Sequence, residues 1–189
     1  MKIEGVYRDM LNSDDEVVVD SGWRPNTIVA DFGRFLATLM KRDLENKVGI
    51  EYIAVGGGNG NDAKFKECVA SFFASKKPKK PYKTDGRWAW AKKIDLSDML
   101  YLDDDQKVTE EVTNRLRIDV AIEKAEPVKE TLVYEEFALL GIDESDGVPN
   151  TNKMFFVDYV NHAPITKDES MKLTRTIVLT FPLEEGEDR

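Results

Sequence analysis

Hydrophobic and polar residues alternate along the second half of the chain. In residues 114–122 the apolar positions are spaced by two: Leu116, Ile118, Val120 and Ile122. Residues 173–181 repeat this pattern with Ile177, Leu179 and Phe181. A period of two is typical of a half-buried antiparallel strand. Residues 132–142 and 153–160 have strand character as well, so we expect four successive strands between residues 111 and 181.

The first half begins with a predicted β-hairpin and a helix. Residues 2–9 and 16–23 favour strands and flank a polar turn at residues 12–15, and Arg24 and Pro25 end the second strand. Asn26 is a good N-cap for a helix over residues 26–42. Its apolar residues follow at helical spacing: Ile28, Val29, Phe32, Phe35, Leu36 and Leu39. We expect this amphipathic helix to pack on a sheet.

A second, shorter helix is predicted after a glycine-rich run. Residues 48–55 form a short apolar strand, and Asp62 is placed to cap a helix that ends at Ala74. The expected inward residues are Cys68, Val69, Phe72 and Phe73. Residues 76–83 read as a stiff, basic, exposed linker, because each proline disfavours helix at the preceding residue. Residues 88–94 and 99–102 then resume strand character.

Together these elements predict a mostly β (α+β) fold. We expect an antiparallel β-sandwich-like domain of eight or nine strands, with one amphipathic helix packed on a sheet and a second short helix. We favour a single domain over residues 1–189. The alternative division has a hairpin–helix–strand–helix part (1–75), a basic Pro/Lys linker (76–86), an antiparallel β part (87–183) and an acidic tail (184–189).

Net charge and composition narrow the classes of partner. The chain has 27 Lys and Arg against 36 Asp and Glu, a net charge of −9, which disfavours nucleic acid and anionic membranes as partners. No apolar run approaches the ~18 residues of a membrane span. The N-terminus does not resemble a signal peptide, so we expect a protein made and assembled in the cytoplasm. Cys68 is the only cysteine and is expected to be a buried, inert thiol.

The glycine-rich run suggests a calcium site. Residues 57–62, Gly-Gly-Asn-Gly-Asn-Asp, fit the start of a calcium-binding nonapeptide, with Asn59, Asn61 and Asp62 as candidate ligands. The pattern fails at Lys64, where that repeat has a large apolar residue, and it occurs once. A flexible turn between strand and helix accounts for the same residues. The run lacks the Lys-Ser/Thr of a phosphate loop.

No residue pattern indicates catalysis, so we expect a protein that is not an enzyme and has no cofactor. Glu135 and Glu136 are neighbours on one predicted strand and should face opposite sides. If one faces inward, it needs a basic partner such as Arg115, Arg117 or Arg175. His162 is the sole histidine, in a predicted turn at a strand end, and no nucleophile motif accompanies it.

Basic and aromatic residues gathered in one segment are the candidate partner contacts. They are Lys76, Lys77, Lys79, Lys80, Lys83, Trp88 and Trp90. In an acidic chain, such lysines suit docking on an acidic neighbour better than nucleic acid. The two tryptophans share a face of a strand and belong either to the core or to a contact. A soluble carbohydrate-binding module that stacks sugars on Trp88, Trp90, Tyr82 and Tyr101 is the alternative function.

The order of several segments resembles a known class of proteins. Residues 6–10 (Val-Tyr-Arg-Asp-Met) and 19–29 lead into the predicted helix, and Ile-Ala-Val-Gly-Gly-Gly follows at 53–58. Residues 134–142, 159–167 and 173–181 complete the pattern, which omits roughly residues 60–112. The order is similar to that of small structural proteins of tailed bacteriophages and related contractile injection systems, found at the tail, baseplate, collar or fibre attachment.

This resemblance implies a virion structural subunit without catalytic residues. Its partners would be copies of itself and other tail or capsid proteins, with no nucleic acid, membrane or small-molecule substrate. Its place would be the virion tail, after assembly in the host cytoplasm. Residues 76–83 are not part of the pattern.

Overall fold

The computed structural model describes residues 4–13, 16–28, 49–58, 60–75, 80–111, 113–145 and 148–181. The N-terminal half contains β1 (Glu4–Ser13), β2 (Glu16–Asp20), β3 (Arg24–Ile28), β4 (Tyr52–Gly57), α2 (Asp62–Ala74), β5 (Tyr82–Thr84) and β6 (Arg87–Lys93). The C-terminal half contains η1 (Leu96–Asp98), β7 (Met99–Leu102), β8 (Val108–Thr109), β9 (Arg115–Ile122), β10 (Leu132–Ser145), β11 (Val148–Phe156), β12 (Asp158–Lys167) and β13 (Lys172–Thr180).

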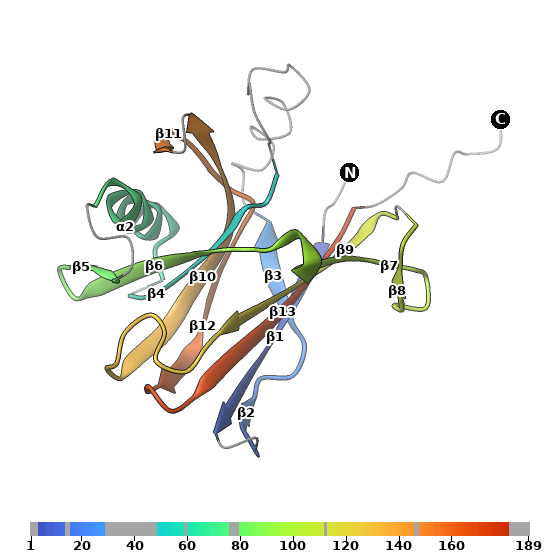
Figure 1. Ribbon diagram of the computed structural model, residues 1–189, viewed down its shortest axis with the longest axis horizontal. Helices are drawn as coiled ribbons and strands as arrows, with labels where there is room; N and C mark the ends of the chain where they lie inside the picture. Colours follow the sequence, from blue (N-terminus) through green and yellow to red (C-terminus); the bar gives the residue numbers. More distant parts are fainter. Residues whose placement is uncertain are drawn as a thin grey trace.

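The strands form two antiparallel layers that are joined through β3. Hydrogen bonding runs in the order β5-β6-β4-β10-β12-β3-β1-β13-β9-β7-β8, while β2 pairs with β1 and β11 pairs with β10. β3 pairs with β1 through Gly5–Tyr7 and with β12 through Asp158 and Tyr159, so it belongs to both layers. Figure 1 shows β1, β13 and β9 packed across β4, β10 and β12. The predicted mostly β, sandwich-like fold is confirmed.

The layer formed by β1, β13 and β9 has one buried and one solvent-facing side. Ile118, Val120 and Ile122 of β9 are buried, as the alternation predicts. On β13 the buried positions are Leu173, Arg175, Ile177 and Leu179. Arg175 therefore occupies an inward position between two apolar neighbours. The predicted alternation of buried and solvent-facing residues is confirmed for these two strands, and on β13 it places the charged side chain of Arg175 in the core.

The other layer is covered on both faces. Val55 and its neighbours on β4 are buried, and α2 packs on the face that points away from β1 and β13 (Figure 1). The inward residues of α2 are Phe65, Cys68, Val69 and Phe72. The predicted second helix is thus confirmed, although Asn61 rather than Asp62 is its N-cap. At 13 residues, α2 falls short of a membrane span, and none of the described helices reaches one.

The predicted helix at residues 26–42 is corrected at its start. Arg24–Ile28 is a strand, β3, so Pro25 does not end the extended segment and Asn26 is not an N-cap. Pairing with β1 and β12 satisfies the backbone there, and tertiary pairing overrides the local capping preference. Residues 29–42 of the predicted helix lie outside the described residues.

Two further boundaries differ from the predictions. The strand expected at residues 153–160 is two strands, β11 and β12, separated at Val157, whose N–H donates to Leu139 O at 2.8 Å. The segment after residue 75 was expected to be an exposed linker through residue 86. Instead Tyr82–Thr84 is a strand, β5, that pairs with β6. β6 in turn pairs with β4. Strand pairing therefore connects β4, which precedes the basic segment in the sequence, with β5 and β6, which follow it.

Candidate functional site

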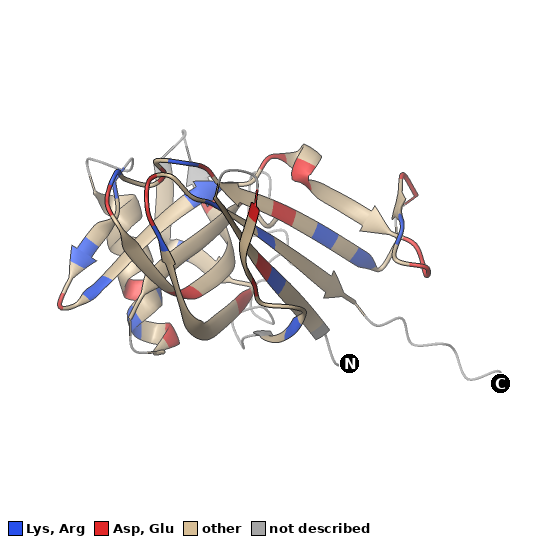
Figure 2. Cartoon of the chain, turned by 90° about the horizontal axis from the view of Figure 1, so that it is seen from below, with Lys and Arg blue, Asp and Glu red and all other residues tan. Residues whose placement is uncertain are grey.

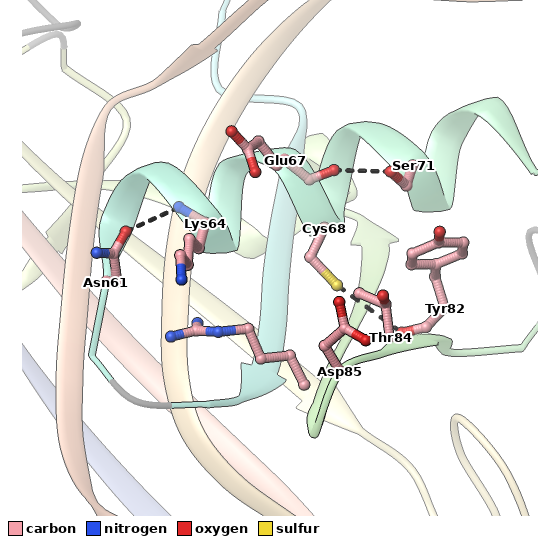
Figure 3. A pocket seen from close by; sticks show the side chains of 9 residues that line it. Asn61, Lys64, Glu67, Cys68, Ser71, Tyr82, Thr84 and Asp85 are labelled. Atoms are coloured by element: carbon pink, nitrogen blue, oxygen red, sulfur yellow. Dashed lines mark hydrogen bonds between the residues drawn. The ribbon is translucent and has the colours of Figure 1, made fainter.

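A polar pocket of about 500 Å³ lies between α2 and the β5–β6 hairpin. Its lining is Asn61, Lys64, Glu67, Cys68, Ser71, Tyr82, Thr84, Asp85 and Arg87. Figure 3 shows α2 forming one wall and the hairpin residues the other. The wall from α2 is internally bonded, because Ser71 Oγ donates to Glu67 O at 2.9 Å. The lining includes two basic side chains, two acidic side chains and several hydroxyl groups, so the surface of the pocket is polar and of mixed charge.

Two candidate calcium ligands, Asn61 and Asp62, accept hydrogen bonds from backbone N–H groups at the start of α2. Asn61 Oδ1 accepts from Lys64 N at 2.9 Å, which caps the helix (Figure 3). Asp62 Oδ1 accepts from Ala63 N at 2.7 Å. Asn59 lies outside the described residues. Among the residues that the structure describes, no group of three His, Cys, Asp or Glu side chains could hold a metal ion. The turn interpretation accounts for Asn61 and Asp62.

A buried carboxylate lies beneath the pocket. Glu136 is fully buried and accepts from Arg87 Nη1 at 3.1 Å and from Tyr159 Oη at 2.7 Å. Burial raises the pKa of Glu136, while the Tyr159 hydroxyl and the Arg87 guanidinium oppose this shift. Its basic partner is therefore Arg87, and not any of the three arginines proposed from sequence. Arg87 also lines the pocket, so the charge of this lining residue is balanced by the buried Glu136 carboxylate.

The two neighbouring glutamates do not face opposite sides, contrary to the prediction. Glu135 Oε2 accepts from Gly58 N at 3.0 Å, and a Cβ on Gly58 would collide with Glu136 Oε1 and Arg87 Nη1. The pairing of β10 with β12 shifts register between Tyr134 and Glu136. A β-bulge at this place turns consecutive residues toward one side, which an alternation rule cannot anticipate.

The cysteine and the histidine are not activated for catalysis and do not meet. Burial raises the pKa of the Cys68 thiol to about 11, so it is protonated at neutral pH. His162 Nε2 lies 3.0 Å from Arg175 Nη2, and His162 Nδ1 lies 2.7 Å from Ala163 O. Burial, together with the Arg175 guanidinium, lowers the pKa of His162 to about 4. Since Arg175 can only donate, the neutral ring carries its proton on Nδ1.

The same arginine is held in a buried ion pair. Arg175 Nε and Nη2 donate to the two carboxylate oxygens of Asp9 at 2.5 Å and 2.9 Å, and both residues are at most 2% exposed. The Arg175 guanidinium also lies over the Phe137 ring, 3.8 Å from its centroid. This cluster connects β1, β13 and β10 across the two layers, which indicates a structural role for His162 and Arg175.

Trp88 and Trp90 belong to the core, which corrects their prediction as partner contacts. They are 8% and 7% exposed, and Trp88 Nε1 donates to Val133 O at 3.1 Å. Trp88 also packs edge-on against Tyr134, with ring centroids 4.9 Å apart. Neither indole presents an open face on which a sugar could stack. The carbohydrate-binding alternative thereby loses two of the four aromatic residues named for it.

The described lysines of the predicted contact segment line a groove. Lys80, Pro81 and Lys83 face the β9–β10 connection, which contributes Ala125, Pro127, Val128, Lys129 and Glu130, around a volume of about 620 Å³. Lys83 Nζ pairs with Glu130 Oε1 at 2.5 Å. Lys76, Lys77 and Lys79 lie outside the described residues. The contribution of Lys129 comes from a distant part of the sequence, so only the fold reveals it.

β2 is an exposed edge strand that carries several apolar residues. All five residues of β2 are exposed, and β1 is its one partner among the described strands. Val17, Val18 and Val19 are 57%, 53% and 39% exposed, and Trp23 just beyond β2 is 53% exposed. The sequence predicted this strand but not its edge position. A run of three valines between two acids, with no alternation, was the available signal.

A shallow groove of about 300 Å³ continues this surface over β1 and β13. It is lined by Arg8, Met10, Trp23, Leu102, Gln106, Arg117, Thr174, Thr176 and Val178. Arg8 pairs with Asp20 of β2. Trp23 thus lines this groove, whose other residues on the outer face of the sheet are both polar and apolar.

Comparisons with known proteins give no match: no protein-family model, no curated protein and no solved structure is similar to this chain at a significant level.

Proposed function

We propose that this protein is a non-enzymatic structural subunit that enters a larger assembly through protein–protein contacts. One observation carries the proposal: among the strands that the structure describes, β2 pairs on one edge only, and its other row of backbone N–H and C=O groups lies beside three exposed valines. Soluble monomers usually protect an apolar edge with a central charge, a proline or a covering loop. β2 has acids only at its two ends, Glu16 and Asp20. Such an edge favours addition of another strand.

The partner strand that fits this edge is β2 of a second copy. Two-fold symmetric pairing centred on Val18 would oppose Glu16 and Asp20, which repel each other. Pairing centred on Val19 instead places Asp20 opposite Val18 and Val17 opposite Ser21, so no acid faces an acid. This second register buries valines from both copies and extends the β1–β13–β9 layer across the two-fold axis.

The narrower proposal is a tail component of a tailed bacteriophage, at the baseplate, collar or fibre attachment. It is supported by the resemblance of the sequence segments alone. The proposed partners are then copies of this chain and other tail or capsid proteins, and the proposed location is the virion tail.

Light scattering on the purified full chain tests the assembly contact. We expect the average mass to rise with concentration toward a discrete oligomer. Val19→Lys should abolish this rise, because the new lysines would face each other in the proposed register. Val133→Lys is the matched control, since Val133 is 41% exposed but lies on β10, which pairs with β4 and β12.

Two results would contradict the proposed assembly through β2. A wild-type mass that stays monomeric at every concentration and salt condition would overturn assembly through this edge. Equal loss of the oligomer in both variants would show that surface hydrophobicity in general, and not the β2 edge, drives association.

A further inference from the structure

The groove between β5 and the β9–β10 connection combines an apolar floor with a basic rim. Pro127 is buried and Val128 and Pro81 are partly buried, while Lys80, Lys83 and Lys129 stand around them. Lys83 is paired with Glu130. Within the described part of the chain, Lys80 and Lys129 have no acidic partner, and both are exposed. In a chain of net charge −9, this is a local surplus of positive charge.

The occupant that this groove fits is an acidic segment that carries an apolar residue. The sequence contains one directly after β13: Leu183 is followed by Glu184, Glu185, Glu187 and Asp188. A leucine suits the proline and valine floor, and the carboxylates that follow it suit the lysines of the rim. The complementarity thus includes both the apolar and the charged parts of the groove.

The acidic segment cannot reach the groove of its own molecule. Ala125 N donates to Glu169 O, so the groove lies beside the start of β13, whereas the acidic residues follow its end. The nine residues of β13 span about 30 Å at ~3.3 Å per residue. Asp188 lies seven residues beyond Phe181 and reaches at most about 25 Å, and Glu184 and Glu185 reach less.

The two parts are also separated along the molecule. Figure 1 shows β5 toward one end of the long axis and β7 and β8 toward the other. The end of β13 lies beside the start of β9, because Thr180 pairs with Arg115. Figure 2 shows Lys and Arg on the β5–β6 hairpin, and acidic residues on the β7–β8 connection. The groove therefore lies far from the end of β13, after which the acidic residues follow in the sequence.

We infer that residues 183–188 of one copy dock in the Lys80–Lys83–Lys129 groove of the next copy. The inference rests on the proposed function as an assembly subunit and names a second, head-to-tail contact in it. Such a heterologous contact propagates to a ring or a filament, whereas the β2 contact closes a pair. The two contacts use different faces and are separable by experiment.

Binding of a fluorescein-labelled peptide of residues 181–189 to the full chain tests the groove directly. Fluorescence anisotropy should show saturable binding that weakens about tenfold or more in Lys80→Glu/Lys129→Glu, because two attractive charges become repulsive. Lys64→Glu/Lys107→Glu is the control with the same change in net charge, since neither residue lines the groove. A peptide with Glu184→Gln and Glu185→Gln should bind the wild type more weakly than the normal peptide does, but less weakly than the normal peptide binds the groove variant, because Glu187 and Asp188 remain and no repulsion is introduced.

The outcomes separate this inference from the proposed function. Absence of peptide binding, or equal weakening in both lysine variants, overturns the groove contact even if light scattering shows assembly. Peptide binding that depends on Lys80 and Lys129 supports the groove contact, including in a Val19→Lys background where the β2 contact is removed.

Discussion

At the scale of single residues, buried charges are the feature that distinguishes this core. Asp9 and Arg175 sit at inward positions of β1 and β13, where the alternation of each strand calls for an apolar residue. They are tolerated because they neutralise each other with two hydrogen bonds, and Phe137 covers the guanidinium. A buried charge that loses its partner is costly, whereas the loss of an exposed pair costs little.

Replacing Arg175 by Met should therefore destabilise the fold by about 3–5 kcal/mol, measured by urea unfolding, because Asp9 would stay buried without a partner. Arg8→Met is the matched control. Arg8 lies next to Asp9 on β1 and makes two hydrogen bonds to the Asp20 carboxylate, but this ion pair is at the surface. The double change Asp9→Leu with Arg175→Met should recover much of the loss. Equal effects of Arg175→Met and Arg8→Met would contradict the assigned role.

Two other buried groups give the stability opposite dependences on pH. Burial raises the pKa of Asp158 from 3.8 to about 7, although its oxygens accept from Leu139 N and Asn26 Nδ2. The folded state then holds a proton that the unfolded state releases, so stability falls as the pH rises from 3.8 to about 7. The lowered pKa of His162 has the reverse effect between about 4 and 6.5, where stability rises with pH.

Asp158→Asn should remove the first contribution and leave a stability that rises with pH between about 4 and 6.5. His162→Gln should leave a stability that falls with pH up to about 7, at a limiting slope of about 1.4 kcal/mol per pH unit. Urea unfolding at a series of pH values measures both slopes. If the two variants have the same slope as the wild type, neither group titrates differently in the folded and unfolded states.

At the scale of elements, close packing of α2 on β4 depends on a glycine. A Cβ on Gly56 would collide with the carbonyl oxygen of Trp88 and lie 2.6 Å from the Phe65 ring. The carbonyl is fixed by the pairing of β4 with β6, so the helix would have to move. Gly56 therefore allows the close approach of α2 to the sheet.

Gly56→Ala should destabilise the fold by about 1–3 kcal/mol, as overpacking of a core does. The near-ultraviolet circular dichroism should change as well, because Trp88 lies next to the altered contact. Gly49→Ala is the control, since a Cβ on Gly49 meets no atom within 4 Å. An unfolding midpoint for Gly56→Ala equal to that of Gly49→Ala would show that α2 shifts without cost.

At the scale of the whole molecule, the net charge gives the two proposed contacts, β2 pairing and docking of the acidic segment, opposite dependences on salt concentration. Copies with a charge of −9 repel one another, and salt screens this repulsion. Pairing of β2 strands is apolar and gains from the screening. Docking of the acidic segment on three lysines is a charge attraction, so it weakens with salt.

Raising the salt concentration should accordingly increase the two-fold oligomer and decrease any larger species, as measured by light scattering at a fixed protein concentration. Removal of Glu184, Glu185, Glu187 and Asp188 by substitution with Gln should abolish the larger species and leave the two-fold oligomer. Larger species that grow with salt would contradict an electrostatic head-to-tail contact.

Local patterns in the sequence determine much of this protein. The alternation in β9 and β13, the short helix α2 and the mostly β class follow from periodicity, because the side-chain direction of a strand or helix repeats regularly. Where that regularity breaks, the sequence misleads. The β-bulge before Glu136 and the extension of β3 through Asn26 both arise from pairing with distant strands.

Only the tertiary structure decides which residues are available to a partner. Trp88 and Trp90 satisfy the composition of a contact surface, yet the fold buries both, and the Trp88 indole donates to Val133 O. The three valines of β2 satisfy the composition of a core strand, yet the strand order leaves them at an open edge. Burial depends on which strands become neighbours, and that is a property of the whole chain that no short segment contains.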